Sequence, residues 1–120
     1  ALFGQSVKEM SKILELYGCG SQNVYLAAGD LYVTVFGGRT RKIGTLLGSG
    51  YSFDDAVAQL KGVTLESIVI AQRTADAISA LALKGKVKRE DFPLLMHIDN
   101  IMKGTPVGDI PWDAFETEML

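Results

Sequence analysis

The sequence is poor in the side chains that most often hold metals or act as nucleophiles. It contains one cysteine, Cys19, and one histidine, His97, in 120 residues. A single cysteine excludes an internal disulfide and a zinc knuckle, and it fits a reducing compartment. No Gly-x-Ser-x-Gly segment accompanies His97, which we expect to be an ordinary surface or rim residue. The sequence therefore predicts no metal centre and no histidine-based triad.

Long apolar runs are also missing. No segment is long enough to cross a bilayer, and no signal peptide is visible. The net charge of −2 argues against a nucleic-acid or membrane partner. The apolar fraction of 48% excludes a disordered chain, and 120 residues suffice for one domain with a core. We expect a single cytoplasmic domain. Because its first helix starts without a capping residue, we expect it to be part of a longer protein.

The most informative segment is residues 29–42. It places Asp30 after a glycine and Thr34 within an apolar run, and it ends in Gly37 and Gly38 followed by basic residues at 39, 41 and 42. The glycines let the backbone approach a ligand, and the guanidinium of Arg39 matches phosphate or carboxylate oxygens. A helix that starts here would add its free N–H groups. The segment predicts an anion site, with a plain turn and a solvated basic face as the alternative.

The apolar spacing indicates helices almost throughout. It predicts helices over residues 1–17, 39–48 and 66–83, and further helices that start at the capping residues Ser52, Asp91 and Asp109. The apolar stripe of the first helix is Phe3, Val7, Met10, Leu14 and Tyr17. The apolar stripe of the helix after Asp91 is Leu94, Leu95, Ile98, Ile101 and Met102.

Residues 24–36 carry conflicting signals. The segment from Leu31 to Phe36 is β-branched and aromatic, which favours a strand. No partner strand of similar quality exists, and a lone strand leaves its backbone groups unsatisfied. We therefore predict a helix here. The sum is an all-α domain of six or seven helices.

These segments resemble the C-terminal domain of NAD-dependent glycerol-3-phosphate dehydrogenase. Gly-Asp-Leu-x-x-Thr at residues 29–34 and Gly-Gly-Arg-x-Arg-Lys at 37–42 resemble the family signature. Leu-Gly-Ser-Gly at 47–50, Arg-Thr-Ala at 73–75 and Lys-Gly-Thr-Pro-Val-Gly at 103–108 agree with it. The resemblance implies a compact helical fold like that of the 6-phosphogluconate dehydrogenase C-terminal domain.

The family combines this domain with an N-terminal Rossmann domain that binds NAD, and residues 1–120 match only the helical part. The resemblance implies an NAD- or NADP-dependent oxidoreductase. It transfers hydride between the cofactor and dihydroxyacetone phosphate or glycerol 3-phosphate, in glycerol-3-phosphate metabolism and phospholipid biosynthesis. The resemblance leaves a homodimer open and implies that this chain is inactive alone.

Substrate roles follow from the resemblance. It implies that Gly38 and Arg39 bind the substrate phosphate, with Arg39 also near the cofactor. Thr40 stands where the family usually has a substrate-binding asparagine. It also implies that Asp30 and Thr34 support catalysis: Asp30 contacts the substrate and orients a catalytic lysine, and Thr34 contacts the substrate or its proton network. By our alignment that lysine falls upstream of Ala1.

The resemblance also implies a cofactor contact before the long helix, where the candidates are Thr64 and Glu66. Two other functions stay open at this point. One is the helical domain of another two-domain hydroxy-acid dehydrogenase, and the other is a stand-alone helical module that binds an acidic partner through its basic segment.

Overall fold

The chain forms helices and turns. The computed structural model describes residues 2–20, 23–35, 38–60 and 65–115, and no strand lies among them. The elements are α1 (Leu2–Leu16), α2 (Asn23–Val35), α3 (Arg39–Gly48), α4 (Phe53–Gln59), α5 (Glu66–Leu83), α6 (Pro93–Met102) and the short 3₁₀ turns η1 (Arg89–Asp91) and η2 (Trp112–Ala114). The all-α prediction is confirmed, including the helix α2 in a segment with strand propensity.

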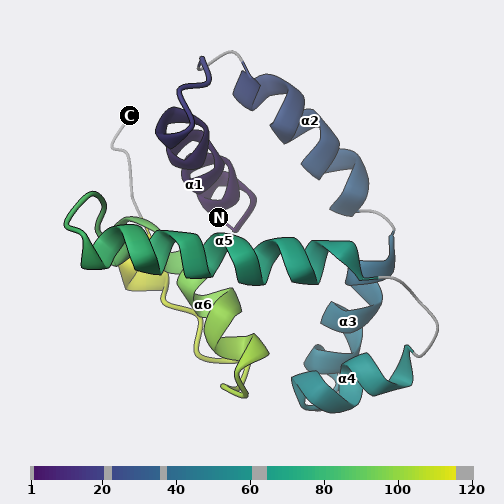
Figure 1. Ribbon diagram of the computed structural model, residues 1–120. Helices are drawn as coiled ribbons and strands as arrows, with labels where there is room; N and C mark the ends of the chain where they lie inside the picture. Colours follow the sequence, from purple (N-terminus) through teal and green to yellow (C-terminus); the bar gives the residue numbers. More distant parts are fainter. Residues whose placement is uncertain (1, 21–22, 36–37, 61–64, 116–120) are drawn as a thin grey trace.

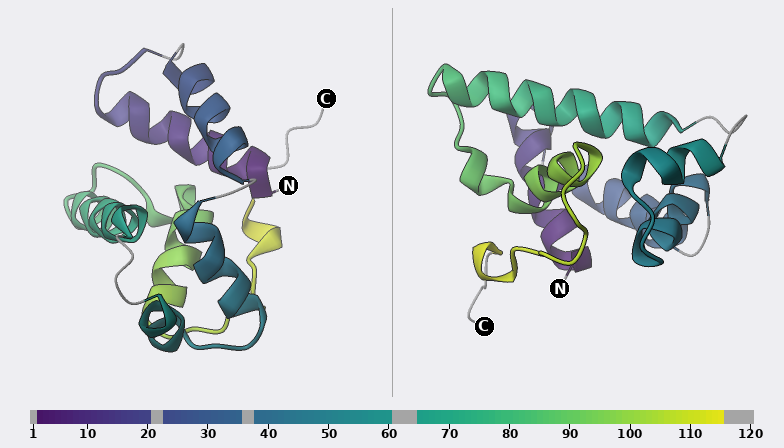
Figure 2. Two further views of the ribbon diagram at one scale, coloured as in Figure 1. Left: turned by 90° about the vertical axis from the view of Figure 1, so that its right-hand side faces the viewer. Right: turned by 90° about the horizontal axis from the view of Figure 1, so that it is seen from below.

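The long helix α5 lies across one face of the molecule, in front of the other helices in Figure 1 and at the edge of both views in Figure 2. Seen as in Figure 1, α1 and α2 lie above α5 and α6 lies below it, and α1 and α6 contact each other behind α5. Helices α3 and α4 pack on each other near the N-terminal end of α5. Helix α6 contacts α1, α4 and α5, so it connects the parts of the fold.

The main core lies where α5 meets η1 and α6. Ala75 and Ile78 of α5 pack with Phe92 and Met96. Half-buried apolar side chains close the cluster, namely Ile13 of α1, Val87 of the turn after α5 and Leu95 of α6. A smaller contact joins α3 to α4, where Ile43 and Ala56 are buried. Helix α2 takes part in neither cluster, and none of its described side chains is fully buried.

A carboxylate of α1 caps α6. Glu9 is 4% exposed. Its Oε2 accepts from the backbone N–H of Leu94 at 2.9 Å, and its Oε1 accepts from that of Leu95, also at 2.9 Å. The amide of Gln5 donates to the same carboxylate at 2.7 Å. A negative charge at a helix N-terminus is favoured both by these N–H groups and by the helix dipole.

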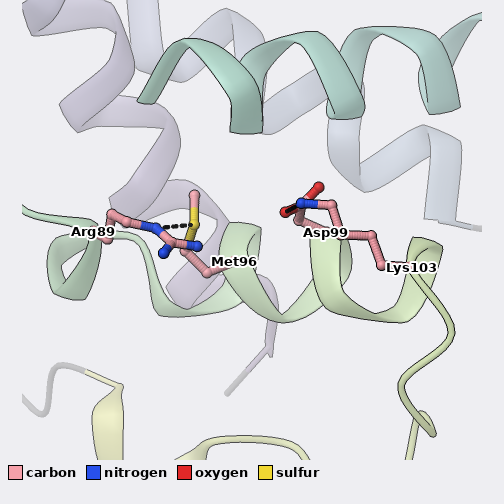
Figure 3. Close-up of polar contacts among 4 residues, drawn as sticks. All are labelled: Arg89, Met96, Asp99 and Lys103. Carbon is pink, nitrogen blue, oxygen red and sulfur yellow. Dashed lines mark hydrogen bonds and ion pairs between the residues drawn. The ribbon is translucent and has the colours of Figure 1, made fainter. Parts of the chain in front are cut away.

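Other polar contacts hold the two ends of α6. Lys12 Nζ donates to the carbonyl of Asp91 at 3.1 Å, just before the helix begins. At the far end the buried carboxylate of Asp99 forms an ion pair with Lys103 at 2.7 Å (Figure 3). Between them, Arg89 Nε lies 3.4 Å from the sulfur of Met96 (Figure 3). The contacts of Lys12 and Glu9 fix α6 against α1 over a sequence separation of about 80 residues.

Two predicted caps are wrong. Asp91 belongs to η1, the N-cap of α6 is Phe92, and the N–H groups of the first turn are bound by Glu9 instead. Asp109 does not start an α-helix within the described part of the tail, which ends at residue 115 and contains the 3₁₀ turn η2 with Pro111 at its N-cap. Both predictions used local spacing, whereas these ends are set by a distant carboxylate and by a proline-rich tail.

The buried faces of α1 and α6 also differ from prediction. In α1 the buried residues are Gln5 and Glu9, whereas Phe3 and Tyr17 of the predicted stripe are exposed. In α6 the buried residues are Pro93, Met96, His97 and Asp99. His97 is therefore buried, and the prediction of a surface position is wrong. In α1, Gln5 and Glu9 are buried because the Glu9 carboxylate binds the first N–H groups of α6 and accepts from the Gln5 amide.

Replacing Glu9 tests the cap. We expect Glu9→Ala to lower the free energy of unfolding by about 2–3 kcal/mol, because two partly buried N–H groups lose their charged acceptor. Glu9→Gln keeps one carbonyl oxygen and should cost less. Urea denaturation measures both, with Glu15→Ala on the exposed side of α1 as the matched control. Equal values for Glu9→Ala and Glu15→Ala would contradict the cap.

Candidate functional site

Asp30 and Thr34 lie one turn apart in the second half of α2. Both side chains are exposed. The hydroxyl of Thr34 donates to the carbonyl oxygen of Asp30 at 2.8 Å. This bond uses the one hydroxyl proton of Thr34, so its oxygen is left as an acceptor. The carboxylate of Asp30 is likewise an acceptor when ionised, and the two residues together present acceptors from one face of α2.

Gly38 brings the end of α2 to the start of α3. It is the N-cap of α3 with φ 98° and ψ 167°, a backbone conformation that is essentially restricted to glycine. A Cβ built at Gly38 would lie 3.9 Å from Cγ2 of Thr34, so the two positions are in van der Waals distance. Gly37 lies outside the described residues. The predicted glycine turn is thus required at position 38 by backbone conformation.

Arg39 and Thr40 are the first two residues of α3, and both are exposed. The hydroxyl of Thr40 forms a hydrogen bond with the hydroxyl of Ser67, the second residue of α5. The N-terminal ends of α3 and α5 therefore lie side by side, and each end carries a partial positive charge from its helix dipole. Neither N-cap, Gly38 or Leu65, supplies a capping side-chain bond.

Two hollows border these helix ends. One, of about 600 Å³, is lined by Gly38, by the cations Arg41 and Lys42 and by residues of α3 and α4. The other, of about 330 Å³, lies along α5 beside Glu66 and Arg73. Only the first hollow brings cations, Arg41 and Lys42, beside the start of α3, and this hollow suits an anionic ligand.

Of the two predicted cofactor contacts, Glu66 and Thr64, the structure describes only Glu66. Glu66 is the exposed first residue of α5, next to Ser67 and at the smaller hollow. Thr64 lies outside the described residues. Ser67 was missed by sequence analysis. The signal that could have found it is its place in the first turn of a predicted helix, where a hydroxyl has no helical carbonyl four residues before it.

The structure thus brings most of the predicted site residues to one place. The end of α2 meets the start of α3 at Gly38, and Thr40 joins α3 to α5 next to Glu66. Elsewhere, within the residues that the structure describes, no three His, Cys, Asp or Glu side chains gather to hold a metal. No described helix is both long and apolar enough to cross a bilayer.

Comparisons with known proteins show the family of this chain. The family described as NAD-dependent glycerol-3-phosphate dehydrogenase C-terminus matches residues 1–109. The chain belongs to this family. An NADP(+)-dependent glycerol-3-phosphate dehydrogenase of Archaeoglobus fulgidus is 32% identical over 111 residues, which are 88% of this chain and 31% of the archaeal protein. The chain thus spans about a third of the length of that relative. No solved structure matches it.

Family membership places the chain among the C-terminal domains of NAD-dependent glycerol-3-phosphate dehydrogenase. The match to the C-terminal part of a glycerol-3-phosphate dehydrogenase includes the Gly-Asp-Leu and Gly-Gly-Arg segments, which form the end of α2 and the start of α3. The resemblance stated from these segments is confirmed. The open alternatives of another hydroxy-acid dehydrogenase and of a stand-alone interaction module have no support from the family match.

Gly38 offers a test of the turn with a control in the same helix. We expect Gly38→Ala to destabilise the chain by about 1–3 kcal/mol, because alanine is strained at this backbone conformation. Gly44 lies inside α3 with open space around it. Gly44→Ala should stabilise by up to about 1 kcal/mol through helix propensity. Thermal unfolding of both variants measures the difference, and destabilisation of the same size in both would contradict the assigned turn.

Proposed function

We propose that this chain is the substrate-binding half of a two-domain enzyme that transfers hydride between NAD(P)(H) and dihydroxyacetone phosphate or glycerol 3-phosphate. The observation that carries the proposal is the start of α3. There, Gly38, Arg39 and Thr40 lie at a helix N-terminus that is joined to the N-terminus of α5. Backbone N–H groups, a guanidinium and a hydroxyl are the donors that a phosphate dianion requires.

Arg39 anchors the phosphate in this proposal. Its side chain is exposed at the first residue of α3, so a ligand can reach it. A guanidinium stays charged and donates two parallel bonds to two phosphate oxygens, which fixes orientation as well as position. Anchoring the remote phosphate lets binding energy hold the carbonyl in place for reaction.

Asp30 and Thr34 act on the carbonyl side. The proton of Thr34 is bound to the carbonyl of Asp30, so the Thr34 oxygen accepts from a substrate hydroxyl or from an ammonium group. The carboxylate of Asp30 also attracts an ammonium group. Together they present the acceptors that would orient a general-acid lysine, which our alignment puts upstream of Ala1.

Glu66 is the residue of this chain that we assign to the cofactor, with Thr64 as a second candidate and Arg39 nearby. Glu66 is exposed beside a hollow of about 330 Å³, and a carboxylate there fits the hydroxyls of a ribose. The nicotinamide of NAD(P)(H), when bound, supplies the hydride chemistry. The residues of this chain hold the substrate phosphate and orient the group that moves the proton.

The apolar face of α2 supports a second domain. Tyr25, Leu26, Tyr32 and Val33 lie on one side of α2 and are 60–78% exposed. Continuous exposed apolar surface of this kind marks a surface that another protein part covers. We assign it to the NAD-binding domain, which would close the site over Asp30 and Arg39. The 120-residue chain should then not oxidise NADH alone.

Replacing Arg39 in the full-length protein tests the phosphate assignment. We expect Arg39→Ala to lower kcat/KM for dihydroxyacetone phosphate by about 100-fold, because charge-assisted hydrogen bonds are lost. Arg39→Lys keeps the positive charge but cannot donate two parallel hydrogen bonds, so its kcat/KM should lie between those of Arg39→Ala and the unaltered protein. Lys84→Ala, in the exposed turn after α5, is the control. Kinetics of Arg39→Ala equal to those of Lys84→Ala would remove the phosphate assignment.

A further inference from the structure

Threonine and serine hydroxyls within the helices mostly donate to their own helix. Thr34, Thr45 and Thr74 each donate to the carbonyl four residues earlier, at distances of 2.8, 3.1 and 2.7 Å. Ser6 makes the same bond to the carbonyl of Leu2 at 2.9 Å. These hydroxyl protons are used within the helix and are not available to a ligand.

Thr40 and Ser67 differ from this pattern because of where they stand. Each is the second residue of its helix, so no carbonyl of that helix lies four residues before it. Their hydroxyls bond to each other instead, across a sequence separation of 27 residues. The pair therefore holds two hydroxyl protons, of which the mutual hydrogen bond uses one.

The direction of this bond matters for an anion. A phosphate dianion only accepts hydrogen bonds, so a phosphate at Thr40 requires the Thr40 proton. Thr40 can give its proton to the phosphate only if Ser67 donates to the Thr40 oxygen. Ser67 would then fix the orientation of the Thr40 hydroxyl, and the proton of Thr40 would point to the ligand.

Packing does not require the pair. Helix α3 is held on α4 through Ile43 and Ala56, and α5 buries Ala75 and Ile78 two or more turns beyond Ser67. Thr40 and Ser67 are both exposed. An exposed hydrogen bond between neutral groups adds little to stability. We therefore expect the pair to orient one hydroxyl proton rather than to stabilise the fold.

We propose that Ser67 is a positioning residue for the substrate phosphate, acting through Thr40, whose hydroxyl it orients as a donor. The inference rests on the proposed function, because it needs a phosphate at the start of α3. It adds a residue that neither the sequence motifs nor the family match assigns to the site. It also explains how a threonine serves where the resemblance leads one to expect an asparagine.

A double-mutant cycle in the full-length protein tests this role through the KM for dihydroxyacetone phosphate. We expect Ser67→Ala to raise KM about fivefold with little change in kcat, which corresponds to one neutral hydrogen bond. In a Thr40→Val background, Ser67→Ala should change nothing further, because the hydroxyl that it orients is gone. Ser67→Thr keeps the hydroxyl and should restore the KM of the unaltered protein.

Ser79→Ala is the matched control, since Ser79 lies on the same helix, 12 residues beyond Ser67. Thermal unfolding should give the same stability for the Ser67 and Ser79 variants. If Ser67→Ala raises KM equally with and without the Thr40 hydroxyl, or leaves KM unchanged, the positioning role is overturned.

Arg39→Ala in the same assay separates the two proposals. A KM raised by Arg39→Ala but not by Ser67→Ala keeps the phosphate site and overturns only the role of Ser67. A KM unchanged by Arg39→Ala overturns the phosphate assignment, and the role of Ser67 with it.

Discussion

The buried carboxylate of Glu9 at the start of α6 is the contact on which the rest of this fold depends. It joins the first helix to residues 94 and 95 by two backbone hydrogen bonds. Helix α6 in turn carries Met96 into the core against Ala75 and Ile78 of α5. That core positions α5. The position of the N-terminal end of α5 therefore depends on contacts made two or more turns farther along the same helix. A carboxylate buried in this way is stable because it accepts several bonds and faces a helix dipole.

The candidate site is made from helix ends that this framework holds. The end of α2, the start of α3 and the start of α5 meet through Gly38 and through the Thr40–Ser67 pair. These elements contribute little to the core, and α2 is exposed along one apolar face. The polar side chains of this site lie on helices and are exposed. That geometry suits a site which a second domain completes.

Much of this could be predicted from the sequence because the signals are local. The start of α3 at Arg39, the capping of α4 by Ser52 and the span of α5 follow from glycine, serine and apolar spacing, and the structure confirms them. The helix α2 was predicted from the lack of a partner strand. Locating the site depended on the resemblance of residues 29–42 to a family, which the family match confirms.

What could not be predicted depends on contacts between distant residues. The cap of α6 comes from Glu9, more than 80 residues away, so the local candidate Asp91 was wrong. His97 is buried because α6 packs on several neighbours at once, which its own apolar stripe does not indicate. A role for Ser67 could be inferred only from the fold, which places its hydroxyl beside that of Thr40. Tertiary contacts decide such positions, and spacing along one helix does not record them.

The central claim is that a phosphate binds where the N-terminal ends of α3 and α5 meet, and an NMR titration of the 120-residue chain tests it most directly. The ligand is glycerol 3-phosphate, with plain glycerol as the control. The account predicts phosphate-dependent shifts of the amides of residues 38–41 and 66–67, which are lost in Arg39→Ala. Shifts that glycerol reproduces, shifts that persist in Arg39→Ala, or no shifts at these residues would contradict it.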